Sequence, residues 1–240
     1  MERFNDSEGW RWYADSLEEF LGGNAYASVT NILKVVNNPS LEKWFIKNTA
    51  DAIDKRRTES ASVGTEIHNM LEANLMGKDD ETLVAKYPVA FDRWLEWRER
   101  NVTGVISGDT YIRHERFGYA GACDAVLEVQ GEPVVVDFKT GSIYDRMQHD
   151  YKEWPKQIKP SISMQIAAYR RALIDGGEYT DSLGAAVLRL SADGKELQYT
   201  AFRQHNACFE AFLAALELFR FTNFNKLKYM NWKFLGEEIG

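Results

Sequence analysis

Two short segments, GACD at Gly121–Asp124 and VVVDFKT at Val134–Thr140, decide the fold that we expect. A mostly apolar run and the turn-forming composition of Gln130–Pro133 separate them, which predicts a hairpin of two strands. Val134–Val136 is apolar on both faces of its strand, which indicates a central strand rather than an edge. Burying an aspartate and a lysine in such a strand is costly unless they have partners, so this hairpin is the first place to look for a site.

Strand geometry groups the charged residues of this hairpin. Successive side chains point to opposite faces of a sheet, so Asp137 and Lys139 share one face. Pairing of the two strands brings Asp124 opposite or diagonal to them on that face, whereas a slip of one residue would separate them. Two carboxylates that share a divalent cation, with an ammonium nearby, suit hydrolysis of a phosphodiester. The alternative is a solvent-facing strand edge with a surface ion pair.

The composition is that of a globular protein. The chain has 240 residues, of which 45% are hydrophobic and 27% are charged. The sequence contains no long apolar run and no signal-peptide pattern, so we expect a cytoplasmic protein without a membrane segment. The formal net charge of −7 argues against a nucleic-acid coat protein, although a local basic lining suffices to contact DNA. The two cysteines are too few for an iron–sulfur cluster held by four thiolates.

The order of the predicted elements is that of an α/β protein. Residues 1–105 are expected to be mainly helical, with helices over about 15–21, from about 28, and over 40–57, 63–76 and 88–101. Then follow strands over 110–117, 120–129 and 134–139, a helix over 161–174, strands over 185–190 and 196–202, and a helix from Asn206 to about 221. We therefore expect a single domain over 1–240, with a central mixed sheet of about five strands flanked by helices. Its α/β core covers 106–222 and a tail covers 223–240.

Polar residues outside the hairpin are further candidates for the site. His68 lies on a predicted helix and is either a hydrogen-bonded boundary residue or a metal ligand. Glu115 either adds a carboxylate to the site or pairs with Arg113 or Arg116. Gln165 shares a helical face with the tyrosine that follows it by one turn, and it either orients a water or a phosphate or is plain helix surface.

Together these residues resemble the motifs of the PD-(D/E)XK nuclease superfamily, and in particular its RecB-like exonuclease branch of phage-type and mitochondrial single-strand exonucleases. Asp124 followed by VVDFK over 135–139 is similar to the catalytic signature. GTEIH over 64–68 is similar to the helix motif before it, and QIAAY over 165–169 to the helix motif after it. SVTNIL over 28–33 resembles a segment near the N-terminus of such nucleases.

The resemblance implies a role for each matching residue. Asp124 and Asp137 would bind Mg²⁺ or Mn²⁺, together with His68 and the backbone carbonyl of Phe138. Lys139 would orient or help deprotonate the attacking water. Residues that would support catalysis or contact the substrate are Glu115, Gln165, Tyr169 and Arg170. The relatives that carry a four-cysteine iron–sulfur cluster are excluded, because this chain lacks the cysteines.

The activity implied is that of a metal-dependent DNA exonuclease in recombination, replication or repair, with a phage origin as one interpretation. A structure- or sequence-specific endonuclease and an inactive module that binds DNA or a partner are the alternatives. The implied partners are DNA, single-stranded or at duplex ends, and a single-strand annealing or replication protein, in the cytoplasm of the cell or of a phage host. Candidate base-stacking residues are Trp10, Trp12 and Tyr13, or Tyr144, Tyr151 and Trp154, with core or lid packing as the alternative. Candidate basic linings for DNA are 55–57, 152–159, 170–171 and 226–233, each of which is otherwise a solvated face.

Overall fold

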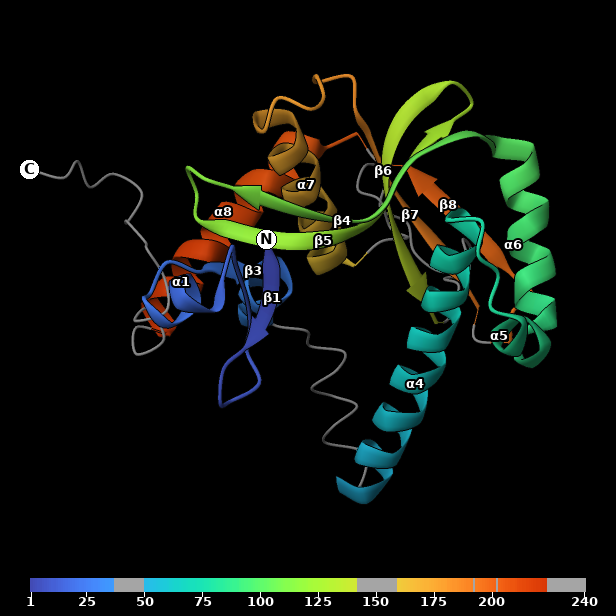
Figure 1. Cartoon of the computed structure of the whole chain (residues 1–240), viewed down its shortest axis with the longest axis horizontal. Helices are drawn as coiled ribbons and strands as arrows, with labels where there is room; N and C mark the ends of the chain where they lie inside the picture. The colour runs from blue at the N-terminus through green and yellow to red at the C-terminus, as the bar shows by residue number, and fades with distance from the viewer. Residues whose placement is uncertain (37–49, 142–158, 192, 202, 224–240) are drawn as a thin grey trace, which may run out of the picture.

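A mixed β-sheet organises the fold (Figure 1). The computed structural model describes residues 1–36, 50–141, 159–191, 193–201 and 203–223, without the side chains of residues 50–61. Over these residues the sheet has eight strands in the order β1-β2-β3-β5-β6-β7-β8, with β4 also paired to β5. The strands are β1 Glu2–Asn5, β2 Arg11–Ala14, β3 Tyr26–Ser28, β4 Val102–His114, β5 Tyr119–Val129, β6 Glu132–Thr140, β7 Gly184–Leu190 and β8 Leu197–Ala201.

Helices cover both faces of this sheet. They are α1 Leu17–Leu21, α2 Val29–Ile32 with the 3₁₀ turn η1 Leu33–Val35, α4 Ala50–Leu75, α5 Glu81–Lys86, α6 Pro88–Asn101, α7 Pro160–Asp175 and α8 His205–Thr222. Figure 1 shows α7 and α8 together on one side and α4 to α6 on the other. None of the described helices combines the length and apolarity that a membrane crossing requires.

β6 confirms the expected central strand. It pairs antiparallel with β5 and parallel with β7. Val135 packs into the core beneath α7 and α8, whereas Val136 and Phe138 pack into the core beneath α4 and α6. Because both faces are covered, the continuous apolar run of this strand is the pattern that its position requires.

The five strands predicted in the α/β part are present, with shifted ends, and three more were missed. β1, β2 and β3 have only three or four residues each, which is too short for an alternating pattern to be recognised. The helices predicted over 40–57 and 63–76 are one helix, α4, in their described part; residues 40–49 lie outside the described residues. The predicted cap at Asn206 is wrong, because α8 begins at His205 with Gln204 as its N-cap.

β5 has a divided edge that positions the site. One edge pairs with β4 along nearly its whole length. On the other edge, β3 pairs with Tyr119 and Ala120, and β6 pairs with Ala125–Val129. Gly121–Asp124 lies between the two pairings, so β3 and β6 diverge at this point. The side chain of Asp124 therefore lies at a fork in the sheet.

Candidate active site

The β5–β6 hairpin has the register that the sequence predicts. Ala125 pairs with Val136, so the next position along places Asp124 opposite Asp137. The backbone N–H of Phe138 donates a hydrogen bond of 2.5 Å to Asp124 Oδ2. Since the N–H and C=O of one strand residue point to the same edge, the Phe138 carbonyl also faces the fork.

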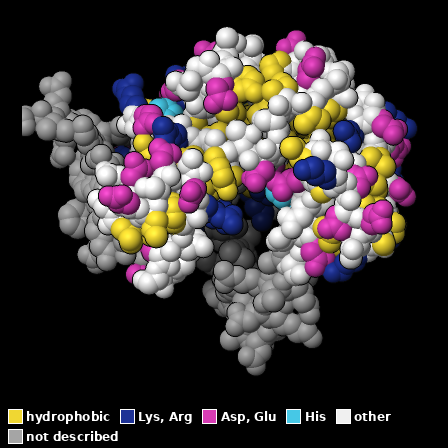
Figure 2. All heavy atoms as spheres, viewed as in Figure 1, with side chains coloured by type: hydrophobic (Ala, Val, Ile, Leu, Met, Phe, Trp, Pro, Cys, Tyr) yellow, Lys and Arg dark blue, Asp and Glu magenta, His cyan; other side chains and the backbone are white. Residues whose placement is uncertain are grey.

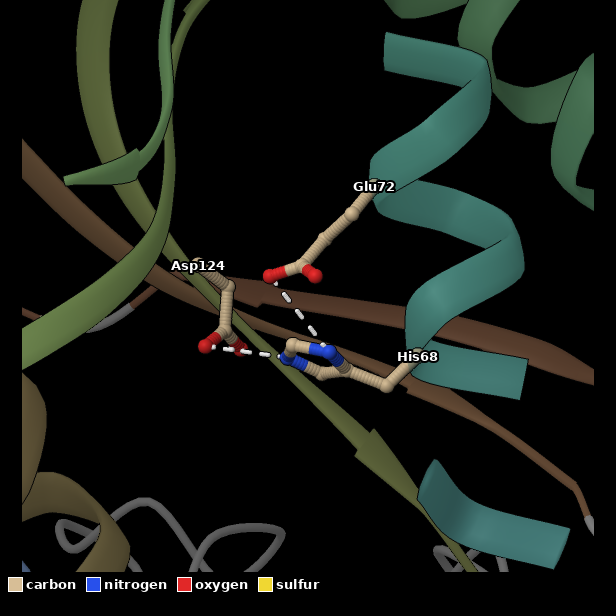
Figure 3. A group of neighbouring side chains, drawn as sticks. All are labelled: His68, Glu72 and Asp124. Atoms are coloured by element: carbon tan, nitrogen blue, oxygen red, sulfur yellow. Dashed lines mark ion pairs between the residues drawn. The ribbon is translucent and has the colours of Figure 1, made fainter. Parts of the chain in front are cut away.

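His68, Glu72 and Asp124 form a group at this fork (Figure 3). His68 Nε2 lies 3.0 Å from Asp124 Oδ1, and His68 Nδ1 lies 3.4 Å from Glu72 Oε1. One ligand atom from each residue lies within 4.8 Å of the others. Burial lowers the pKa of His68, but its hydrogen bonds to Asp124 and Glu72 outweigh burial and raise the pKa to about 10. The carboxylates of Glu72 and Asp124 thus hold the positively charged imidazole of His68 between them.

Asp137 and Lys139 lie beside this group. Asp137 is only 1% exposed, and Lys139 Nζ lies 2.5 Å from its Oδ2. Burial raises the pKa of Asp137 to about 6, with the Lys139 charge opposing the rise and the Asp124 charge adding to it. Burial lowers the pKa of Lys139, but the charges of Asp137 and Asp124 outweigh it and raise the pKa above its ordinary value.

The donor set fits a divalent cation. Neither oxygen of Asp137 accepts a hydrogen bond of ordinary geometry from any described residue, although both are buried. A buried carboxylate in this state calls for a cation beyond its ion pair with Lys139. Carboxylate and carbonyl oxygens suit Mg²⁺ and Mn²⁺, and an imidazole nitrogen suits transition metals.

Two carboxylates at the site were missed by sequence reasoning. Glu72 follows His68 by one turn of α4, so the helical period alone would have found it. Asp109 of β4 lies between Gly108, which pairs with Ala125, and Thr110. It is therefore level with the aspartate of β5, a position that only the β4–β5 register reveals. Its φ of 39° is in the left-handed region, which Asp tolerates better than most residues.

The site opens into a pocket of about 600 Å³. Its lining combines α4, β4 and β6 with the β1–β2 hairpin, through His68, Glu72, Asp109, Lys139, Arg3 and Arg11 among others. Figure 2 shows acidic, histidine and basic side chains around a hollow near the centre of this face of the molecule. Candidate metal ligands and basic groups from distant parts of the chain thus share one pocket.

α7 supports the fork from behind. Gln165 Nε2 donates a hydrogen bond of 2.9 Å to the hydroxyl of Tyr169. Tyr169 is 2% exposed and packs against Gly121, where a Cβ atom would lie 2.6 Å from the ring. Burial raises the pKa of Tyr169 well above its ordinary value, and the charges of Asp137 and Asp124 add to the effect. Tyr169 is thus placed to position the aspartate strand rather than to meet a substrate.

The structure gives Glu115 and Arg170 partners other than those expected from the sequence. Glu115 follows the end of β4, accepts a hydrogen bond of 2.5 Å from Tyr26 and lies 2.7 Å from Arg113 Nε. It lies six positions along the chain from Asp109, roughly 20 Å of extended strand. Of the two alternatives for Glu115, the structure thus favours the ion pair with Arg113 over a place among the site's carboxylates.

Arg170 was expected to contact the substrate, but it is only 5% exposed. Its Nε and Nη2 donate hydrogen bonds of 2.6 Å to the backbone carbonyls of Leu183 and Asp181. Arg170 therefore holds the connection between α7 and β7. Among the candidate aromatic contacts, Trp12 and Tyr13 are buried, and residues 144–158 lie outside the described residues.

The sheet, its charged hairpin and the histidine helix define the class of this protein by its fold, which is a restriction-endonuclease-like core. A family model for the PD-(D/E)XK nuclease superfamily matches residues 40–228, and the chain belongs to that superfamily. Members of this superfamily generally use a divalent metal, and the group described above offers the ligands for one.

Relatives within the superfamily are distant. The chain is 24% identical over 169 residues to the mitochondrial genome maintenance exonuclease 1 of Mus musculus. This match covers 65% of the chain and 47% of the relative. The chain is 25% identical over 174 residues to the Homo sapiens protein of the same name, and this match covers 65% of the chain and 46% of that protein. The chain thus spans about half the length of these curated relatives. A crystal structure of a proposed exonuclease from Eubacterium rectale has a TM-score of 0.49 at 11% identity, covering 94% of this chain and 86% of the other.

Proposed function

We propose that this protein is a metal-dependent DNA exonuclease. The observation that carries the proposal is that His68, Asp124, Asp137 and Lys139, from α4, β5 and β6, meet at one fork in a chain of the nuclease superfamily. The exonuclease names of the two mammalian relatives support the exonuclease assignment. The proposal includes a role in recombination, replication or repair, in the cytoplasm of a cell or of a phage host.

The metal in this proposal is Mg²⁺ or Mn²⁺. Its ligands would be Asp124, Asp137, His68 and the backbone carbonyl of Phe138. When bound there, the cation supplies Lewis-acid chemistry, which neutralises charge on the phosphoryl oxygens and acidifies water. Glu72 accepts the Nδ1–H of His68 and so orients the ring with Nε2 toward Asp124.

Lys139 supplies a fixed positive charge beside the reacting phosphate. Its ammonium pairs with Asp137, and its raised pKa keeps the proton on Nζ. A protonated lysine orients water by donating a hydrogen bond and offsets the negative charge that develops on the phosphorus oxygens. This favours water orientation over deprotonation as the role of Lys139.

The test is digestion of 5′- and 3′-labelled single- and double-stranded DNA with Mg²⁺ or Mn²⁺. We expect degradation from the ends and no cleavage of a covalently closed circle. Asp137→Ala and Lys139→Ala should lower the rate by about a hundredfold or more. Arg100→Gln, which removes a charge 72% exposed on α6, should cut as the parent does.

Three outcomes would overturn parts of this proposal. A Lys139→Ala protein that cuts at the parent rate contradicts the mechanism. Cleavage of the closed circle identifies an endonuclease instead. Binding of DNA without cleavage under either metal identifies an inactive binding module.

A further inference from the structure

We propose that Arg3 and Arg11, on the β1–β2 hairpin, bind the phosphates of the DNA strand that flank the scissile phosphodiester. This inference rests on the proposed nuclease function and adds a phosphate-binding wall to its site. No sequence motif pointed to either arginine.

The hairpin register places the two arginines on one face. Asn5 pairs with Arg11, and Arg3 pairs with Tyr13. Since Arg3 and Asn5 alternate with Phe4, the guanidinium groups of Arg3 and Arg11 belong to diagonal neighbours, about 7–8 Å apart at the backbone. That spacing is comparable to the distance between successive phosphates of one strand.

Both arginines line the pocket that holds the metal-binding group. His68 and Glu72 contribute to that pocket from α4, and Lys139 contributes from β6. Arg3 is close enough to Asp109 for its charge to oppose the rise in the pKa of that carboxyl. A strand whose scissile phosphate lies at the fork would therefore have basic groups within reach on the hairpin.

Among the described residues, no carboxylate forms an ion pair that would neutralise Arg3 or Arg11. In contrast, Arg113, Arg171 and Arg220 all form such pairs. Arg11 is half-buried and hydrogen-bonded to Tyr13, and Arg3 is exposed. A guanidinium binds phosphate through paired hydrogen bonds, so these two groups suit DNA phosphates.

The hairpin is anchored, so its arginines are held in position before any ligand binds. Trp12 and Ala14 of β2 are fully buried. Asn31, 4% exposed, donates a hydrogen bond of 2.8 Å to the backbone carbonyl of Arg11. Asn31 belongs to the SVTNIL segment, so this segment helps to hold the backbone of Arg11 at the pocket. Such preorganisation lowers the entropy cost of binding.

The experiment measures kcat and KM on a labelled single-stranded oligonucleotide between about 50 and about 200 mM salt. For Arg3→Gln and Arg11→Gln we expect KM to rise roughly tenfold with kcat little changed. The slope of log(1/KM) against log[salt] should become shallower by about 0.7 for each lost contact. Arg11→Lys should retain most of the slope, and Arg100→Gln should leave KM and slope unchanged.

A small chromogenic phosphodiester, thymidine 5′-p-nitrophenyl phosphate, separates the two levels of the proposal. It lacks flanking phosphates, so the arginine variants should cleave it as the parent does. Parent-like KM and slope on DNA in both variants would overturn the role of the arginines and leave the nuclease function standing. A parent protein inert on DNA and on the small ester would overturn the nuclease function, and this inference with it. Arg3 is exposed and unpaired within the described chain, so its variant gives a result even where Arg11→Gln fails to fold.

Discussion

Glu72 makes two contributions at the level of single residues. It accepts a hydrogen bond from His68, and its charge raises the pKa of both His68 and Asp109. A carboxylate behind a metal-binding imidazole sets the ring's orientation and increases its basicity. Glu72 therefore acts on His68, the imidazole that we propose as a metal ligand.

We expect Glu72→Ala to weaken Mn²⁺ binding by about 10- to 100-fold, because the His68 ring loses its orienting partner. Isothermal titration with Mn²⁺ measures the change. Glu66→Gln is the matched control on the same helix, because Glu66 contacts Lys86 and Tyr87 instead. An unchanged Mn²⁺ affinity in Glu72→Ala would show that Glu72 does not orient the ring.

Single residues differ in how well sequence reasoning places them. Asp124, Asp137 and Lys139 were predictable because strand alternation and a short turn relate them locally. Arg170 was not, because its backbone acceptors lie beyond the end of its own helix. A charged side chain on a helix looks the same in sequence whether it faces solvent or buried carbonyls.

At the level of elements, α4 and β6 approach each other closely beside the site. A Cβ atom at Gly64 would lie 2.7 Å from Thr140 Oγ1. Glycine within a helix costs about 1 kcal/mol relative to alanine. Packing therefore explains why glycine occupies position 64 of the GTEIH motif: without a side chain there, the His68 helix can lie against the Lys139 strand.

We expect Gly64→Ala to reduce the cleavage rate, because the added methyl group pushes α4 away from β6. A glycine-to-alanine change in a helix with free space around it stabilises the fold by roughly 1 kcal/mol, and we expect Gly64→Ala to lack this gain in the free energy of unfolding. Thr140→Ala removes the clashing oxygen, so the double variant should recover both rate and stability. Urea unfolding and DNA digestion of the four proteins measure this cycle. Stabilisation of Gly64→Ala by about 1 kcal/mol with full activity would contradict the proposed contact.

The short strands β1 to β3 mark the limit of element prediction. Each is stabilised mainly by its neighbours, as in the pairing of β3 with β2 on one side and β5 on the other. Longer elements with a clear period, such as α6 over Pro88–Asn101, were predicted to the residue.

For the whole molecule, the half-buried His205 contributes to the pH dependence of stability. Burial lowers the pKa of His205 to about 4 from an ordinary 6.5, and the Arg170 charge adds to this. The unfolded chain therefore takes up a proton at higher pH than the folded one. Stability from neutral His205 is present above pH 6.5 and is lost as pH falls from 6.5 toward about 4.

We expect the urea midpoint to fall less between neutral pH and about pH 5 in His205→Gln than in the parent, because glutamine takes up no proton. His68, with its raised pKa, shifts stability in the opposite sense, but equally in both proteins. Equal pH dependence of the two midpoints would show that His205 does not resist protonation in the folded state.

The hairpin of β5 and β6, its register and its charged face follow from residue order, because a period of two and a short turn are local properties. The motifs GTEIH and QIAAY can be read from residue order as well, because each lies within one helix. The fork beside Asp124, the carboxylate of Asp109 and the arginines of the β1–β2 hairpin depend on tertiary structure. These meet through pairings between distant segments, whose register depends on the packing of the whole sheet rather than on any local pattern.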